Sequence, residues 1–485
     1  MIKRVEYPQA VYTPQRVREY VGNPFIEALP EIMSTDVLAQ RLTRRPPFDP
    51  SERDEPSHLR FHMLERLRQL LIVFPAYFDI ESSIGALIRQ GYIHRNPFDP
   101  AAVRRVYQAR TAEMSPLVSA VGPRASSELV FVGLSGLGKT TLIESILDCY
   151  SPQILRHSSY NGQPLHVTQI VWVKINCPHD GSLSAVCRSF FAEIDAITGT
   201  TRYAQEYADP RLSVTNLTDG MQQVAASYAL GALVVDEMQN LSLQKSGGRE
   251  KMMNFFMNLR ASIGVPVIYV GTYKSIALFQ SEMRYCRRAS GRGLKELRRP
   301  PSWKSPVWSL LLEAVFAYQW VKRPIALSDG LKKLLWDLSQ GITDVLVALV
   351  INAQDYAIRH KSETLDTKIF NHVYKTDLRL LHPALNALRS RNPKKLARFD
   401  DLYAQAKGEK VPLNYEALGL DPATILGSLA LTGGAIENSE LGAALPTKPS
   451  GSRATGTEAE GNYDLDLQEI MEGGGASTIS QGEFR

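Results

Sequence analysis

Cysteine is scarce in this sequence, and its few cysteines are not paired. Of 485 residues four are cysteine, Cys149, Cys177, Cys187 and Cys286, and no two of them are separated by two residues. This spacing excludes a zinc knuckle and provides no disulfide framework. Cys177 and His179 share a short segment, but a metal site needs further ligands. We therefore expect reduced thiols, which suit a reducing compartment.

Long hydrophobic runs are also absent. The most apolar stretch, LLIVFPAYF at 70–78, falls far short of the roughly 18 consecutive apolar residues that favour a membrane-spanning helix. The opening residues, MIKRVEYPQAVYTPQRV, contain no apolar core of signal-peptide length. We therefore expect a cytoplasmic protein with no membrane partner.

The charges are distributed unevenly along the chain. The net charge is +5, yet residues 451–485 hold seven acidic residues against two arginines, so residues 1–450 carry an excess of ten positive charges. A basic body favours contact with a polyanion, although an excess of this size is a weak indication of nucleic-acid binding.

Residues 1–115 are expected to form a mostly helical N-terminal extension. Proline-rich loops alternate there with short amphipathic patterns. In residues 58–74 apolar residues recur at spacings of three and four, which predicts a helix. Arg60, Arg66 and Arg68 are expected on the solvent-exposed face of that helix.

Residues 116–304 have the pattern of an α/β domain. Continuous apolar runs rich in β-branched residues are typical of strands buried on both faces of a parallel sheet. Such runs are ELVFV (128–132), QIVWVKI (169–175), ALVVD (232–236) and PVIYVG (266–271). Helical patterns at 182–197 and 248–263 are interpreted as crossover helices. The sequence therefore predicts a doubly wound parallel sheet.

Residues 305–400 carry only helical patterns. Ser328 and Thr343 each stand where a helix is expected to begin, so we expect a small helical bundle directly after the α/β core. From residue 401 to 485 the composition turns to Gly, Ala, Ser and Thr, which is typical of a flexible linker. Within this acidic tail, YDLDLQEIM at 463–471 is either a partner-binding peptide or part of a solvated tail.

Glycines stand between the first predicted strand and the helical pattern that follows it. Residues 133–140, GLSGLGKT, fit the P-loop pattern G-x-x-x-x-G-K-[ST]. Glycines accept the positive φ angles that let backbone N–H groups curl around phosphate oxygens. Lys139 is expected to contact the β- and γ-phosphates of ATP, and Thr140 to bind Mg²⁺. The expected nucleotide-binding residues of this loop are Gly133, Ser135, Gly136, Leu137, Gly138, Lys139, Thr140 and Thr141.

The second part of the predicted site lies in ALVVDEMQNL, 232–241. Asp236 ends a predicted buried strand, where a lone carboxylate is costly without a partner such as Mg²⁺. Glu237 is suitably placed to orient a water toward the γ-phosphate. Thr272, just past the run at 266–271, is expected either to touch that water or phosphate or simply to begin a loop.

A dense basic run follows at 283–304. It holds eight lysines and arginines against one acidic residue, Glu296. Three interpretations stay open: the run supplies an arginine to the nucleotide of a neighbouring subunit, it grips DNA, or it is a solvated loop.

The order of these motifs is similar to that of the AAA+ ATPases, which place a helical lid after the arginine cluster. More narrowly, residues from about 10 to 400 resemble the TnsC family, ATP-dependent regulators of Tn-seven-type transposons that are related to the TniB and MuB proteins. Segments outside the nucleotide site make this resemblance more specific than a P-loop alone. The segments are EYVGNPFIEALP (19–30), IRQGYIHRNP (88–97), GLSGLGKTT (133–141), NCPHDGSLSAVCRSFF (176–191), LGALVVDEMQNLS (230–242), SGGREKMMNFF (246–256), IGVPVIYVGTYK (263–274), SQGITDVLVALVINAQ (339–354) and LHPALNALRS (381–390).

The resemblance implies a bacterial, DNA-associated ATPase that uses ATP and Mg²⁺ as a switch. TnsC-type proteins assemble as homo-oligomeric rings or helical filaments around duplex target DNA. They take the target from a TniQ/TnsD-type selector, expected here at the N-terminal extension. They pass it to the transposase TnsB and its partner TnsA, expected here at the C-terminal tail. The nucleotide-site residues that carry over are Lys139, Thr140, Asp236, Glu237 and Thr272.

The resemblance also implies two further kinds of contact. Arg287 or Arg288 becomes the arginine that reaches the nucleotide of a neighbouring subunit. The candidates for DNA contact, in segments that can face the interior of a ring, are Lys174, His179, Lys245, Arg249 and Lys251. The chain departs from the AAA+ plan at GITDV, 341–345, where Thr343 and Asp344 replace the arginine that often begins a lid helix.

Two other functions stay open on the sequence alone. A replication-type clamp or helicase loader shares the expected fold but has different partners. A signalling NTPase could instead use the long termini as scaffolds and never bind DNA. A small-molecule phosphotransferase fits poorly, because the sequence indicates no acceptor pocket.

Overall fold

The computed structural model describes most of the chain up to residue 399. The described residues are 6–111, 128–178, 181–241, 254–255, 265–279, 292–390, 392–396 and 399. All of them belong to one compact unit within residues 1–431.

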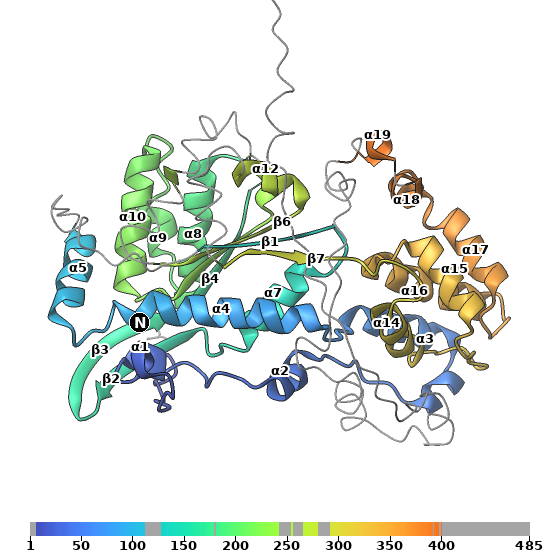
Figure 1. Ribbon diagram of the computed structural model, residues 1–485, viewed down its shortest axis with the longest axis horizontal. Helices are drawn as coiled ribbons and strands as arrows, with labels where there is room; N and C mark the ends of the chain where they lie inside the picture. Colours follow the sequence, from blue (N-terminus) through green and yellow to red (C-terminus); the bar gives the residue numbers. More distant parts are fainter. Residues whose placement is uncertain are drawn as a thin grey trace, which may run out of the picture. The chain divides into compact units, whose positions relative to one another are not determined.

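A five-stranded parallel sheet forms the centre of this unit (Figure 1). The strands are β1 (Leu129–Gly133), β4 (Trp172–Asn176), β5 (Ala232–Asp236), β6 (Val267–Gly271) and β7 (Leu294–Leu297), in the order β4-β5-β6-β1-β7. Every residue of β1, β5 and β6 is buried, because helices cover both faces of the sheet. The predicted α/β parallel-sheet class is confirmed.

Helices cover this sheet on both faces. In Figure 1 the sheet lies between α8 (Leu183–Thr198) and α10 (Val214–Ser227) on one side and α4 (Pro75–Ile93) and α7 (Lys139–Asp148) on the other. A short helix, α9 (Arg202–Glu206), packs on α8. The crossover helix predicted at 182–197 is confirmed as α8, which Ser182 caps by accepting a hydrogen bond from the Ala185 amide at 3.2 Å. The helix predicted at 248–263 lies outside the described residues.

An antiparallel hairpin precedes β4 and was not predicted. It consists of β2 (Ile154–Tyr160) and β3 (Gln163–Ile170). The run at 169–175, expected to be one strand, is divided between the end of β3 and β4. The division falls at Val171, where the chain passes from one sheet to the other: its amide donates to the carbonyl of Gln153, next to β2, at 2.8 Å, and its carbonyl accepts from the Ala232 amide of β5 at 3.1 Å.

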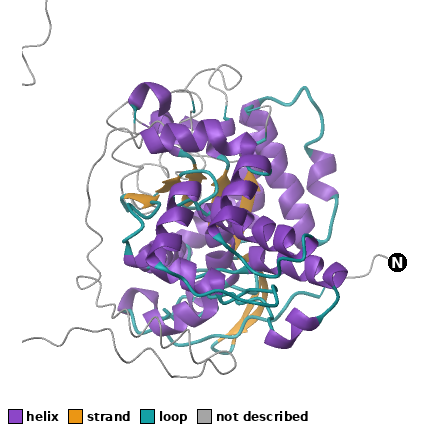
Figure 2. Cartoon of the chain, turned by 90° about the vertical axis from the view of Figure 1, so that its right-hand side faces the viewer, coloured by secondary structure: helices purple, strands orange, loops and turns teal. Residues whose placement is uncertain are grey.

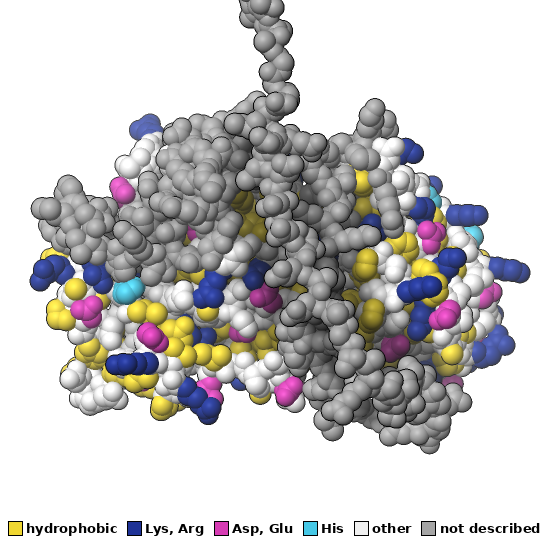
Figure 3. Space-filling view, in the orientation of Figure 1, with side chains coloured by type: hydrophobic (Ala, Val, Ile, Leu, Met, Phe, Trp, Pro, Cys, Tyr) yellow, Lys and Arg dark blue, Asp and Glu magenta, His cyan; other side chains and the backbone are white. Residues whose placement is uncertain are grey.

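In the described residues after β7, all the regular elements are helices. They are α14 (Pro306–Phe316), α15 (Asp329–Ser339), α16 (Thr343–Arg359), α17 (Thr367–Thr376), α18 (His382–Ser390) and α19 (Pro393–Leu396), with a 3-10 turn at Arg379–Leu381. Ser328 caps α15 as predicted, whereas α16 already includes Thr343 and its N-cap is Ile342. These helices form the predicted lid, and Figure 3 shows lysine and arginine side chains on its surface.

The N-terminal residues are mostly helical, as predicted. Besides α4 they form α1 (Pro24–Glu27), α2 (Thr35–Leu42), α3 (Ser57–Leu64) and α5 (Pro100–Thr111), with 3-10 turns at Arg18–Tyr20, Pro50–Asp54 and Glu65–Gln69. The single helix predicted at 58–74 is wrong. The helix α3 ends at Leu64, and a 3-10 turn follows it. The backbone is then extended at Leu71, because Leu71 and Arg44 pair: the N–H of each donates to the carbonyl of the other at 3.0 Å.

The expectation that Arg60 faces solvent is also wrong. Arg60 is 2% exposed. Its guanidinium donates to both carboxylate oxygens of Glu363, at 2.7 and 2.8 Å, and to the carbonyl of Trp320 at 2.8 Å. The neighbouring Arg66 pairs with Glu52 at 2.7 Å. Arg60 therefore fastens the N-terminal extension to the helical lid.

Figure 2 shows the strands enclosed by helices in a second view. Within the described residues no single helix is long and apolar enough to cross a membrane, although α15 and α16 together, bent by 115° at their junction, reach that length and composition.

Replacing Arg60 should destabilise the protein strongly. Arg60→Ala removes the guanidinium from Glu363 and from the Trp320 carbonyl and leaves the Lys322 amide, at 3.2 Å, as a donor to Glu363, so we expect the free energy of unfolding to fall by about 3 kcal/mol in chemical denaturation. Arg68→Ala is the matched control, because Arg68 forms an exposed pair with Glu65, and its effect should stay below about 0.5 kcal/mol. Equal effects of the two substitutions would contradict the buried role of Arg60.

The effect of Arg60→Ala should depend on pH. Hydrogen bonds from Arg60 hold the pKa of the Glu363 carboxyl below its usual value of 4.5. A lowered folded-state pKa stabilises the protein above the unfolded-state pKa, and this contribution is lost as the pH falls through the folded-state value. The destabilisation should therefore be complete at pH 7 and shrink progressively below about pH 4.5. The measurement is the difference in unfolding free energy between parent and variant across that range.

Candidate functional site

The loop between β1 and α7 has the backbone that the glycine pattern predicts. Gly136 and Gly138 have φ angles of 79° and 87°, in the left-handed region that favours glycine. Gly138 is the N-cap of α7, so the positive end of that helix points into the loop. At Gly133 a Cβ atom would lie 2.7 Å from the carbonyl oxygen of Leu297, so glycine is needed where β1 passes β7.

The lysine and threonine that follow these glycines lie at the start of α7. Nζ of Lys139 donates to the carbonyl of Leu134 at 2.9 Å, across the loop. Oγ1 of Thr140 donates to Oδ2 of Asp236 at 3.0 Å. Thr140 and Asp236, which are 96 residues apart in sequence, therefore meet as the sequence predicts.

Asp236 ends β5 as a buried carboxylate, 2% exposed. Its Oδ1 accepts from the Glu237 amide at 2.8 Å. Its Oδ2 lies 3.7 Å from Nζ of Lys174, on the neighbouring strand β4. A buried charge needs such partners, because burial removes its contact with water.

Glu237 is held in a left-handed conformation with φ 57°, unusual for a residue other than glycine. The side-chain amide of Gln239 donates to Oε2 of Glu237. The Oε1 of the same Gln239 accepts from the Thr272 amide at 3.0 Å. Gln239 thus links the end of β5 to the end of β6. Gln239 is not among the predicted site residues, and its only signal in the sequence is its place two residues after Glu237.

Thr272 lies where β6 ends and is 3% exposed. Its Oγ1 is buried and has no hydrogen-bond partner within the described part of the chain. Leaving a buried hydroxyl unpaired costs about 1–3 kcal/mol. An orphaned hydroxyl beside Glu237, a loop of left-handed glycines and a hydroxyl–carboxylate pair together fit a magnesium-bound nucleoside triphosphate.

The helical lid contacts the glycine loop directly. The amide of Asp344, in the first turn of α16, donates to the carbonyl of Gly136 at 2.9 Å. A Cβ atom on Gly136 would lie 3.0 Å from Cγ2 of Ile342. The position that often carries an arginine in AAA+ lids therefore supplies a backbone contact here.

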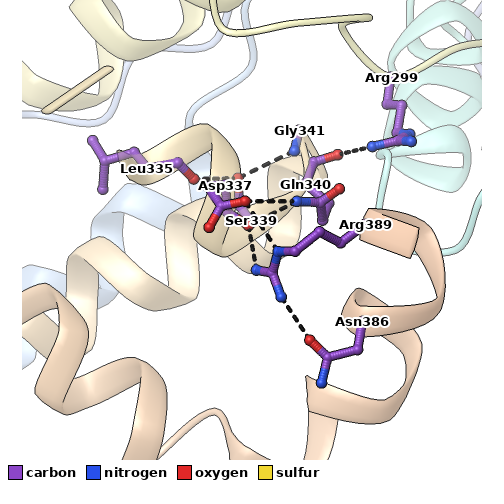
Figure 4. Close-up of polar contacts among 8 residues, drawn as sticks. All are labelled: Arg299, Leu335, Asp337, Ser339, Gln340, Gly341, Asn386 and Arg389. Atoms are coloured by element: carbon purple, nitrogen blue, oxygen red, sulfur yellow. Dashed lines mark hydrogen bonds and ion pairs between the residues drawn. The ribbon is translucent and has the colours of Figure 1, made fainter. Parts of the chain in front are cut away.

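The turn between α15 and α16 is fixed from two sides (Figure 4). Arg299, in the segment after β7, donates to the carbonyl of Gln340 at 2.7 Å. Arg389 of α18 donates to Oδ1 of Asp337 at 3.0 Å and to its carbonyl at 2.7 Å. Arg299 belongs to the predicted basic run, but nothing in the sequence distinguished it from the other arginines there.

Several predicted site residues belong to segments that the structure does not describe. The candidates Arg287, Arg288, His179, Lys245, Arg249 and Lys251 lie outside the described residues. Lys174 is described, and its side chain is 13% exposed and pairs with Glu144 of α7 at 2.9 Å. Its contact with DNA stays a prediction.

Nothing in the described residues indicates a histidine- or cysteine-rich metal site. No group of three or more His, Cys, Asp or Glu residues is placed to hold an ion there. Cys149, Cys177 and Cys187 are free and buried, and burial raises the pKa of the Cys177 and Cys187 thiols to about 12.

Gln239 should position Glu237 for nucleotide hydrolysis. A hydrogen bond to a charged group contributes about 1.5–3 kcal/mol. Gln239→Ala should therefore raise the activation free energy by roughly 1.4 kcal/mol or more, which lowers kcat at least tenfold. Nucleotide affinity should change little. Gln239→Glu keeps an oxygen for the Thr272 amide but cannot donate to Glu237, and it should be equally slow.

The matched control is Asn240→Ala. The side-chain amide of Asn240 donates to the carbonyl of Cys177 at 3.1 Å. Its backbone amide donates to the Glu237 carbonyl at 2.9 Å, and alanine keeps that contact, so kcat of the variant should stay close to that of the parent. Parental kcat in both Gln239 variants would contradict the positioning role.

Comparisons with known proteins support this interpretation of the site. Residues 125–278 match the protein family described as AAA domain, a segment that includes β1, α7, β5, β6 and Thr272. No curated protein matches the chain.

Similarity to solved structures is weak. Orc1 of Aeropyrum pernix in complex with DNA is 15% identical over 67% of this chain and 92% of its own, with a TM-score of 0.36. Cdc6p of Pyrobaculum aerophilum is 13% identical over 62% and 78%, with a TM-score of 0.34. The RuvB Holliday junction branch migration motor of Thermotoga maritima is 15% identical over 66% and 81%, with a TM-score of 0.31. At such scores these similarities carry no argument about function. The family match, together with the geometry of the loop, places in residues 125–278 an AAA domain with a P-loop nucleotide site.

Proposed function

We propose that this protein is an ATP-dependent regulator of DNA transposition, which assembles as a homo-oligomer on duplex target DNA and is reset by ATP hydrolysis. The observation that most directly supports an ATP-driven switch is the group at the ends of β5 and β6. There Asp236 meets Thr140 at 3.0 Å, and Gln239 links Glu237 to Thr272.

Each residue of this group has a distinct part in the proposed hydrolysis. Thr140 and Asp236 hold Mg²⁺, which neutralises charge on the phosphates when bound. Lys139 moves from the Leu134 carbonyl to the β- and γ-phosphates. Glu237 orients the attacking water and accepts its proton. Thr272 directs its otherwise unpaired hydroxyl to that water or to the γ-phosphate.

The lid supplies the means by which the nucleotide changes the rest of the protein. The loop expected to wrap the phosphates bonds through the Gly136 carbonyl to the first turn of α16. A ligand shifts an equilibrium only by binding one state better than another. A loop that adjusts to a γ-phosphate changes its contact with α16, and we propose that this contact selects the lid position that fits a neighbouring subunit.

The proposed role in transposition rests on the segments that resemble TnsC. Two of them, 19–30 and 88–97, contact each other: Asn23 donates to the Tyr92 carbonyl at 2.7 Å, and Asn96 donates to the Gly22 carbonyl at 2.9 Å. A third, 339–354, contains the turn and helix that meet the glycine loop. The first two segments are therefore joined to each other, and the third is joined to the site.

The proposed partners follow the same resemblance. A TniQ/TnsD-type selector binds the N-terminal extension, and TnsA and TnsB bind the C-terminal tail. Arg287 or Arg288 reaches the nucleotide of a neighbouring subunit, so the oligomer forms only with ATP in place. The four-part division at 1–115, 116–304, 305–400 and 401–485 belongs to this proposal, in a bacterial cytoplasm.

DNA binding should depend on the nucleotide. With ATP or a non-hydrolysable analogue, the parent protein should bind long duplex DNA of random sequence as a large assembly, and with ADP it should bind much more weakly. The affinity should also fall with salt, because phosphate contacts release counterions. Sedimentation and filter binding measure both properties, and Lys139→Ala is the control that should not assemble. Failure of the parent to bind DNA with every nucleotide would favour a signalling NTPase.

Glu237→Gln should separate ATP binding from hydrolysis. The amide cannot accept a proton, so kcat should fall by about 100-fold or more, while ATP is retained and DNA-bound assemblies last longer than those of the parent. Glu206→Gln, on the exposed surface of α9, is the control and should behave as the parent does. Parental ATP turnover by Glu237→Gln would refute the assignment of the water-orienting residue.

A further inference from the structure

Lys174 lies among carboxylates at the edge of the nucleotide site. It projects from β4 toward α7, and its side chain is 13% exposed. Its Nζ lies 2.9 Å from Oε1 of Glu144 and 3.7 Å from Oδ2 of Asp236. One ammonium group is therefore shared between a half-exposed glutamate and a buried aspartate.

A cavity of about 410 Å³ opens beside this group, between α7, β4 and α8. Glu193 of α8 lines it; burial raises the pKa of the Glu193 carboxyl, and the charge of Lys174 offsets only part of that rise. Lys174 thus faces two carboxylates besides Asp236, and it has space into which its flexible side chain can move.

The oxygen of Asp236 that faces Lys174 is the one that matters for a metal. Oδ2 also accepts the hydroxyl of Thr140 at 3.0 Å, and this hydroxyl–carboxylate pair is the expected Mg²⁺ site. Asp236 is 2% exposed, so water screens its interaction with a nearby cation poorly. A lysine at this distance and a divalent ion therefore repel each other strongly.

We propose that Lys174 competes with Mg²⁺ for Asp236, and that Glu144 tunes this competition by sharing the Lys174 ammonium. The inference rests on the nucleotide site of the proposed function. Before nucleotide arrives, Lys174 supplies the positive charge that a buried carboxylate requires. In the loaded site it turns fully to Glu144 and Glu193. Lys174 is thus a positioning residue that sets the Mg²⁺ concentration at which the site fills.

The proposal predicts opposite effects for two substitutions. In the full-length protein, binding of a fluorescent ATP analogue is titrated with Mg²⁺. Lys174→Met removes the competing cation and should lower the half-saturating Mg²⁺ concentration about fivefold. Glu144→Gln removes the charge that attracts Lys174 away from Asp236, so Lys174 should compete more strongly and the half-saturating Mg²⁺ concentration should rise about threefold. A merely structural role would weaken binding in both variants, because either change would disturb the same packing.

Two further proteins complete the test. Asp148→Asn is the matched control, because Asp148 lines the same cavity but pairs with Arg44 at 2.8 Å, and it should leave the Mg²⁺ dependence unchanged. The double variant Lys174→Met/Glu144→Gln should behave as Lys174→Met alone, since Glu144 acts through Lys174.

Shifts in the same direction for the two single variants, or no shift in either, would overturn the competition while leaving the nucleotide site intact. A parent protein that binds no nucleotide at any Mg²⁺ concentration would instead overturn the proposed function, and this inference with it.

Discussion

The buried carboxylate of Asp236 is the constraint around which the site is built. A charge that is 2% exposed is unfavourable unless neighbouring groups replace the water that it has lost. Those groups come from three elements: the Thr140 hydroxyl from α7, the Glu237 amide from the end of β5, and the Lys174 ammonium from β4. Satisfying one carboxylate therefore fixes the glycine loop, the strand end that carries Glu237 and the edge strand relative to one another.

The lid is held at two separate places, one on the glycine loop and one on the N-terminal extension. At the start of α16, the Asp344 amide donates to the Gly136 carbonyl of the glycine loop. Beyond the other end of α16, Glu363 accepts hydrogen bonds from Arg60 of the N-terminal extension. Glu52 extends the second attachment by accepting hydrogen bonds from Trp320 and Arg66. A movement of the lid against the loop must therefore bend α16 or carry the N-terminal helices with it.

Sequence reasoning succeeded where a pattern is local. Four apolar runs contain strands, and the glycine spacing matches a loop with positive φ angles at Gly136 and Gly138. It failed where distant segments decide the outcome. The burial of Arg60 depends on Glu363, some 300 residues away, and the extended backbone at Leu71 depends on its pairing with Arg44. Strand β7 was not predicted, because LKEL places two adjacent charged residues between two leucines within a basic run.

The turn between α15 and α16 fixes a length as well as a direction. Gln340 and Gly341 both have positive φ angles, 53° and 72°, and a Cβ atom on Gly341 would come within 3.3 Å of Pro300. This tight turn fixes the number of residues between the end of α15 and the first turn of α16. One inserted residue would rotate α16 by about 100° and carry the Asp344 amide away from Gly136. The turn can therefore be lengthened only at the cost of the contact between the Asp344 amide and the Gly136 carbonyl.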